Sequence, residues 1–399
     1  MKRIKFIPGI LVVVLLALNF IDCDKHSTKP EQPKIRGEII STNSLNVFSK
    51  EEIKHLITAY NIPFTTELSY SVEVIQMVYQ TIDSKENFIQ ASGAVMIPMN
   101  GENLPLLSLH HGTETKREMV ASVSPFNSTE GFAGLIMASI GYLCCLPDYP
   151  GFGMSEILHP YLHAKSLSIA VIDYLRAVKS YCAEKKISLN GQLFLTGYSE
   201  GGYVTLAAHK EIEQNYSDEF DVTAAAPMAG PYDLIGTTKS IFQDSTYNSP
   251  AYIAFFLTAY NEIYGWDRLT EIFNDPYGEK MPSLFDGSQT YGEINSQLPV
   301  KINELLRQNF IDDYQNGKET EFISVIEENS LLNWTPNAPI RFYHGDADDT
   351  VPYQNALTTV ENLRDNGGTN IELITLEGKD HETAGLPAIL GMIEWLNGF

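Results

Sequence analysis

Residues 197–202 read Gly197-Tyr198-Ser199-Glu200-Gly201-Gly202, a Gly-x-Ser-x-Gly pattern with one further glycine. An apolar run of strand type, 192–196, precedes them, and a helical pattern, 203–213, follows. A serine on a sharp turn between strand and helix stands clear of the backbone, and only glycine fits beside it. The helix also directs its free N–H groups and positive dipole end toward the serine. This context predicts that Ser199 is a nucleophile.

Strand and helix patterns alternate on both sides of this turn. Strands are expected at 70–82, 88–99, 104–109, 142–146, 192–196, 223–228, 340–343 and 371–376. Helices are expected at 50–60, 130–140, 167–182, 203–213, 354–364 and 387–396. Such alternation predicts an α/β fold, with a mostly parallel, doubly wound sheet and helices on both of its faces.

The alternation pauses after Gly230. Residues 231–336 are instead helical and aromatic, with helices expected from Ser249-Pro250 onward, over 300–310 and over 319–328. An insertion of this length is too long for a loop. We therefore expect a helical lid or cap after the sixth strand, 223–228, dividing the core into parts 38–230 and 337–399.

A serine nucleophile requires a base, and the base requires an orienting acid. One late strand leads into His344-Gly345-Asp346-Ala347-Asp348-Asp349-Thr350-Val351-Pro352, and the next leads into Glu377-Gly378-Lys379-Asp380-His381. The carboxyl ends of parallel strands meet at one edge of a sheet, where such groups belong. The sequence predicts His381 as the base and an aspartate of the first segment as the acid.

These motifs resemble those of the α/β-hydrolases. His-Gly-x-x-Asp-x-x-Val-Pro is that superfamily's common setting for its acid, and here it selects Asp348, with Asp346 and Asp349 as flanking residues. The resemblance implies a fold with the acid-bearing strand after the lid or cap. It also implies a catalytic triad of Ser199, Asp348 and His381.

The resemblance further implies an oxyanion hole formed by two backbone N–H groups, those of Thr113 and Glu200. Thr113 ends the segment His110-His111-Gly112-Thr113, in which the two histidines are interpreted as structural. The Glu200 carboxylate would oppose a developing oxyanion. We therefore expect its side chain to point away or to pair with a cation.

Three motifs together, His-Gly-Thr at 111–113, Pro-Asp-Tyr-x-Gly at 147–151 and Gly-Tyr-Ser-x-Gly-Gly at 197–202, resemble the secretory lipase group. That resemblance implies hydrolysis of carboxylic esters, small or lipid, through an acyl-enzyme and without metal or organic cofactor. A prolyl-oligopeptidase-type serine peptidase is the alternative, although only about 50 mature residues precede the first expected strand. A non-catalytic surface-binding lipoprotein is a third reading, which the intact triad residues disfavour.

The N-terminus has the pattern of an export signal. A basic start, 1–5, and an apolar stretch, 6–20, are followed by Cys23 and a polar linker to 37. Residues 1–22 thus read as a signal peptide that resembles a bacterial lipoprotein signal, although Asp22 stands where such signals carry a small residue. We expect lipidation of Cys23 in the cell envelope, with an ordinary periplasmic or secreted protein as the alternative.

Composition excludes several other classes. The formal net charge of −23 disfavours nucleic acid and anionic membrane surfaces as partners. Beyond Cys23 only Cys144, Cys145 and Cys182 occur, too few for a disulfide framework, and they are interpreted as core residues. No Cys/His spacing indicates a zinc site.

Overall fold

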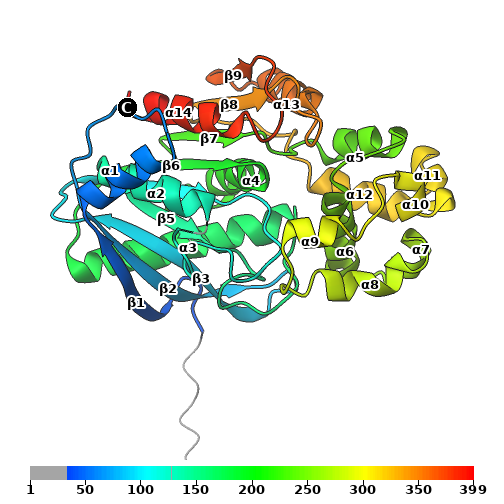
Figure 1. The fold of residues 1–399 in the computed structure, drawn as a ribbon, viewed down its shortest axis with the longest axis horizontal. Coiled ribbons are helices and arrows are strands. Elements are labelled where there is room, and N and C mark those ends of the chain that lie inside the picture. The colour runs from blue at the N-terminus through cyan, green and yellow to red at the C-terminus, as the bar shows by residue number, and fades with distance from the viewer. Residues whose placement is uncertain (1–33, 127) are drawn as a thin grey trace, which may run out of the picture. The chain divides into compact units, whose positions relative to one another are not determined.

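The computed structural model describes residues 34–126 and 128–399, in which one nine-stranded sheet carries the fold (Figure 1). The expected signal peptide and Cys23 lie outside the described residues. The strand order is β1-β2-β3-β5-β4-β6-β7-β8-β9. β1, β2, β3 and β5 pair antiparallel in that order, and the neighbours from β5 to β9 pair in parallel. The strands are Ile39–Phe48 (β1), Val72–Ile82 (β2), Phe88–Pro98 (β3), Leu104–His110 (β4), Leu143–Pro147 (β5), Leu189–Tyr198 (β6), Ala224–Met228 (β7), Ile340–Gly345 (β8) and Ile371–Leu376 (β9).

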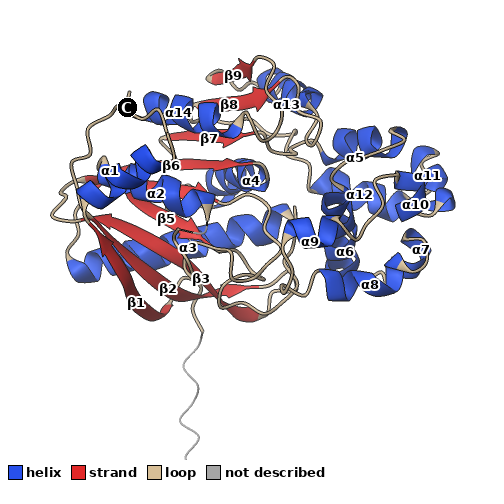
Figure 2. Ribbon diagram, viewed as in Figure 1, coloured by secondary structure: helices blue, strands red, loops and turns tan. Residues whose placement is uncertain are grey.

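Helices cover both faces of the sheet (Figure 2). The core on one face includes residues of Ala164–Lys185 (α3), Glu200–Asn215 (α4) and Tyr353–Asp365 (α13), and the core on the other includes residues of Lys50–Ala59 (α1), Thr129–Ser139 (α2) and Gly385–Leu396 (α14). Successive strand residues alternate between the two cores, as Leu106 and Leu107 do in β4. Such strands are buried on both sides, which is why they read as continuous apolar runs. Cys144 and Cys145 alternate in the same way, and with Cys182 they are free and buried.

The helices between β7 and β8 form the segment expected as a lid or cap, here called the cap helices. In Figure 1 they lie together at one end of the sheet. They are Leu234–Gln243 (α5), Pro250–Tyr264 (α6), Leu269–Ile272 (α7), Tyr277–Leu284 (α8), Tyr291–Asn295 (α9), Ile302–Leu305 (α10), Gln308–Gln315 (α11) and Thr320–Glu328 (α12). Ser249 is the N-cap residue of α6, with proline at the first helical position, as predicted.

Two sequence expectations were wrong. The chain begins its sheet with β1, which the sequence pattern did not indicate, so the strand before the cap helices is the seventh and not the sixth. The single helix expected over 300–310 is broken, because Leu306 is extended and forms an antiparallel bridge with Phe273. Arg307 holds the break by donating its backbone N–H to the Ile272 carbonyl at 2.9 Å.

Candidate active site

Ser199 lies at the turn between β6 and α4. Its φ of 58° and ψ of −122° are rare for a residue other than glycine. The two glycines after Ser199 have no room for a side chain, because backbone of neighbouring strands lies too close. A Cβ on Gly201 would lie 2.1 Å from the His110 carbonyl oxygen, and a Cβ on Gly202 would lie 2.3 Å from the Met228 carbonyl oxygen. The turn therefore presents the serine hydroxyl at the carboxyl edge of the sheet.

Ser199, His381 and Asp348 form one hydrogen-bonded chain. Nε2 of His381 lies 2.9 Å from Oγ of Ser199, and Nδ1 of His381 lies 2.6 Å from Oδ2 of Asp348. The three residues follow β6, β9 and β8, whose carboxyl ends share one edge of the sheet. The arrangement allows the imidazole to take the serine proton while the carboxylate stabilises the resulting charge.

The surroundings of Asp348 keep it ionised. Its Oδ1 accepts the backbone N–H groups of Thr350 at 3.0 Å and Val351 at 2.8 Å, and its Oδ2 also faces Nε2 of His344 at 3.2 Å. Burial alone would raise the Asp348 pKa, but the hydrogen bonds from His344 and His381 outweigh it and lower the pKa from 3.8 to about 2. The acid is therefore a carboxylate at neutral pH.

The flanking aspartates lie elsewhere. Asp346 is exposed and its Oδ1 accepts the Gly378 N–H at 2.6 Å, and Asp349 is also exposed. Within the described residues, only Asp348 of the three hydrogen-bonds to His381.

Thr113 and Glu200 each have a backbone N–H group that is free to bind a ligand. Glu200 is the first residue of α4, so its N–H has no carbonyl partner within the helix. Thr113 follows Gly112, where an added Cβ would lie 3.8 Å from the Cβ of Ser199. Across residues 34–126 and 128–399, neither of these two N–H groups is hydrogen-bonded. Such a pair of donors next to a nucleophile suits an oxyanion.

The Glu200 carboxyl group is buried and pairs with His159, which is a cation only when its ring is protonated. Oε1 of Glu200 lies 2.6 Å from Nε2 of His159, and both side chains are at most 2% exposed. Nδ1 of His159 donates to the Pro150 carbonyl at 2.8 Å. The pair is therefore either an imidazolium with a carboxylate or two neutral groups. In both arrangements its net charge is zero, so it does not oppose negative charge near Ser199.

His111 supports the loop that carries Thr113. Its two ring nitrogens face the carbonyl oxygens of Gly112 at 2.8 Å and Asp148 at 2.9 Å, so both must donate. Burial opposes charge on this ring, but the nearby carboxyl groups of Glu200 and Glu130 and the two carbonyls outweigh it and raise the His111 pKa. His110 differs, because burial lowers its pKa to about 3 and keeps it neutral.

Two further observations limit the chemistry of the described residues. In the part of the chain that the structure describes, no three His, Cys, Asp or Glu side chains group as a metal ion would require. Among the helices of residues 34–126 and 128–399, none combines the length and hydrophobicity of a bilayer-spanning helix.

A family model described as secretory lipase matches residues 133–398. The chain belongs to this secretory lipase family. Its sequence is 21% identical over 309 residues to Secreted triacylglycerol lipase LIP1 of Malassezia furfur, in an alignment that covers 74% of this chain and 61% of that relative. The chain thus spans about three fifths of that relative's length.

Solved structures place this family member in a known fold. The rice cell wall degrading esterase LipA from Xanthomonas oryzae is 28% identical, with a TM-score of 0.81 over 90% of this chain and 96% of that chain. Candida antarctica lipase A shares the fold at 16% identity, with a TM-score of 0.65 over 92% of this chain and 83% of that chain. These similarities confirm the α/β-hydrolase fold that the motifs indicated.

Sequence reasoning missed two residues of this secretory lipase family member's site. The hydroxyl of Tyr161 lies 2.9 Å from Oγ1 of Thr113, and His159 pairs with Glu200. Segment 159–161, on the loop after β5, therefore contacts both residues of the expected oxyanion hole. A buried glutamate next to the predicted nucleophile needs a partner that shares or donates a proton, which could have directed attention to the histidines. No comparable signal indicated Tyr161.

Proposed function

We propose that this protein hydrolyses carboxylic esters through an acyl-enzyme, with Ser199 as nucleophile, His381 as general base and acid, and Asp348 as the orienting acid. The observation that carries the proposal is the hydrogen-bonded chain from Ser199 Oγ through the His381 ring to Asp348 Oδ2. Membership of the secretory lipase family supports a lipid or smaller ester as substrate.

The reaction would proceed in two halves. Ser199 Oγ attacks the ester carbon while His381 Nε2 takes its proton, and the backbone N–H groups of Thr113 and Glu200 stabilise the oxyanion. His381 then returns the proton to the departing alcohol. His381 next takes a proton from a water molecule that attacks the acyl carbon, and returns it to Ser199 Oγ as the acyl–serine bond breaks and the acid is released. Because the Glu200–His159 pair has no net charge in either protonation state, the Glu200 side chain would not oppose the oxyanion that its own N–H binds.

A fluorophosphonate probe and two substrate types test the proposal. We expect the probe to label wild type and not Ser199→Ala, and p-nitrophenyl esters to be cleaved faster than aminoacyl-prolyl amides. Ser199→Ala or His381→Ala should lower kcat by about 10⁴–10⁶-fold, as in other serine hydrolases. Equal labelling of Ser199→Ala would remove the nucleophile assignment. Faster amide cleavage would favour the peptidase, and absence of labelling in wild type would favour a non-catalytic binding protein.

We also propose export and anchoring through a lipid on Cys23. The names of the Malassezia furfur relatives describe them as secreted, which supports export, and the N-terminal pattern of the sequence supports the anchor. Mass spectrometry of the mature N-terminus should find an acylated cysteine, and Cys23→Ala should move the protein out of the membrane fraction. An unmodified start away from Cys23 would contradict the anchor.

A further inference from the structure

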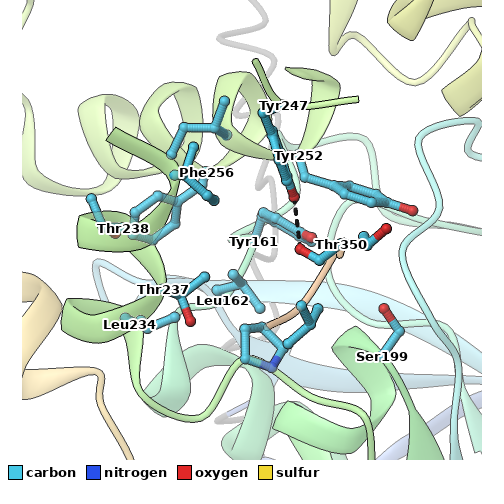
Figure 3. Close-up of a pocket in the computed structure, with 14 residues that line it drawn as sticks. Tyr161, Leu162, Ser199, Leu234, Thr237, Thr238, Tyr247, Tyr252, Phe256 and Thr350 are labelled. Carbon is cyan, nitrogen blue, oxygen red and sulfur yellow. Dashed lines mark hydrogen bonds between the residues drawn. The ribbon is translucent and has the colours of Figure 1, made fainter. Parts of the chain in front are cut away.

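Two cavities of very different size meet at Ser199. The smaller, of about 40 Å³, lies beneath the cap helices, and the larger is about 420 Å³. Figure 3 shows the smaller one, with Phe256 and Leu234 on one side, Thr350 on another and the Ser199 hydroxyl nearby. Tyr252 of α6 lines both cavities and so stands at their junction. The two cavities thus offer separate spaces for the two substituents of an ester bound at Ser199.

His381 distinguishes the two cavities, because it lines the larger and not the smaller. In ester hydrolysis the base returns its proton to the oxygen of the departing alcohol. That oxygen must therefore lie within reach of His381 Nε2, on the side of the larger cavity. The acyl chain, bonded to the opposite side of the carbonyl carbon, is left with the smaller cavity.

The size of the smaller cavity limits the acyl chain. One water molecule needs about 10–15 Å³ on this scale, so 40 Å³ accommodates about three or four heavy atoms. Its walls combine buried apolar and aromatic side chains, including Ile241, Ile253 and Phe256, which are at most 6% exposed, with the threonines Thr237, Thr238 and Thr350. Close-packed walls of this kind do not yield to a longer chain without strain.

The larger cavity has a mainly apolar lining that also includes carboxyl groups. Phe64 and Phe132 contribute to its apolar lining, together with one face of α14. Glu114, Glu130 and Glu382 line the same space, and Oε1 of Glu130 accepts a hydrogen bond from the Gly112 N–H at 3.0 Å. No lysine or arginine is among the described residues that line it. This lining suits a large, uncharged, mainly apolar alcohol and disfavours a phosphorylated or sulfated one.

We propose that the preferred substrate is an ester of a short acyl group, of about two to four carbons, with a larger apolar alcohol. This inference rests on the proposed function and adds the substrate class to it. It assigns the smaller cavity to the acyl group and the larger cavity, which is lined by α2 and α14, to the alcohol.

Two series of esters separate the acyl and alcohol requirements. In the first, p-nitrophenyl acetate, butyrate, hexanoate and octanoate share one alcohol. We expect kcat/KM to be at least tenfold lower for octanoate than for butyrate. In the second, ethyl, hexyl and dodecyl acetate share one acyl group and have leaving alcohols of similar acidity, and we expect kcat/KM to rise with alcohol length. Preference for octanoate over butyrate would overturn the inference.

Cavity variants test the assignment directly. Phe256→Ala, or the milder Phe256→Leu, should enlarge the smaller cavity and raise the octanoate-to-butyrate ratio of kcat/KM at least tenfold. Thr237→Phe should instead fill that cavity and lower kcat/KM for butyrate more than for acetate. Leu386→Trp, at a 40% exposed position on the larger cavity, should lower kcat/KM for hexyl acetate and leave the acyl profile unchanged. A change of acyl profile in Leu386→Trp alone would reverse the assignment.

Folding and activity controls keep the two proposals distinguishable. Thermal unfolding and fluorophosphonate labelling of each variant show whether the fold and the nucleophile are retained. Wild type that is neither labelled nor active on any ester would defeat the proposed function. Wild type that is labelled and cleaves octanoate best would defeat only the substrate class.

Discussion

Replacing Asp348 by asparagine separates the role of its charge from that of its shape. Oδ1 of Asp348 accepts two backbone N–H groups, so an asparagine will keep its carbonyl oxygen on them and present its NH₂ group to His381. Nδ1 of His381 must then accept a hydrogen bond, and the ring proton moves to Nε2. An imidazole in that tautomer cannot take the proton of Ser199.

The expected loss follows from this tautomer change. In serine hydrolases the wrong tautomer lowers kcat about 10⁴-fold, or about 5 kcal/mol of transition-state stabilisation. The effect on stability is smaller. Because the folded-state pKa of about 2 lies below the ordinary 3.8, the carboxylate stabilises the fold by about 2 kcal/mol above pH 4. That contribution disappears as pH falls toward 2, and the asparagine lacks it throughout.

Two assays measure these effects. Steady-state hydrolysis of p-nitrophenyl acetate gives kcat, and urea unfolding at pH 7 gives the free energy of unfolding. Asp349→Asn is the matched control, because Asp349 is exposed in the same loop. The kcat of this variant should stay within about twofold of the wild-type value. The reasoning is refuted if Asp348→Asn keeps more than a tenth of wild-type kcat, or if Asp349→Asn loses as much.

Three further predictions concern the surroundings of the site. Tyr161→Phe should lower kcat about fivefold to tenfold with little change in KM, because the hydrogen bond that positions Thr113 is lost. A change in KM alone would contradict a role of Tyr161 in positioning Thr113. Burial raises the Glu114 pKa from 4.5 to about 7, so its ionisation destabilises the fold progressively between those pH values and fully above them. Urea unfolding should therefore show Glu114→Gln gaining up to about 3 kcal/mol at pH 8 relative to wild type and little at pH 4, and a difference independent of pH would contradict that cause. Gly201→Ala should lower the melting temperature strongly, because its Cβ would lie 2.1 Å from a carbonyl oxygen. Gly292→Ala is the control, since its Cβ would meet nothing within 4 Å and should leave the melting temperature unchanged. Equal melting temperatures for the two variants would contradict the predicted clash.

The sequence predicted the central strands because both of their faces are buried, so their apolar residues run without interruption. β1 escaped notice for the opposite reason. It pairs with β2 alone at the sheet edge, and most of its side chains are exposed, so its residues carry no apolar run or clear alternation. The break between α10 and α11 was equally hidden, since it depends on the bridge of Leu306 to Phe273, which lies far away in sequence.

The same distinction applies to the site. Ser199 and His381 could be predicted because each follows a parallel strand, and the sheet brings those strand ends together. Asp348 could be predicted among three aspartates only through the motif resemblance. The contact of His344 with the acid was not predicted: His344 lies in β8, and the loop that follows brings Asp348 to within 3.2 Å of its Nε2. Contacts of segment 159–161 depend on how an irregular loop packs, and local sequence does not encode that packing.

The column of aromatic rings that runs from the cap helices to Tyr161 has a consequence for protein engineering. The ring of Phe255 in α6 stacks on those of Phe285 and Tyr161. The ring centroids are 4.5 Å and 4.8 Å apart, and the interplanar angles are 4° and 8°. Tyr161 in turn contacts Thr113. We therefore expect that substitutions in the cap helices that change substrate preference will also change kcat. We also expect that a cap transplanted or redesigned to admit new esters must retain a ring at 255, because its loss would also loosen Tyr161, which contacts the proposed oxyanion donor Thr113.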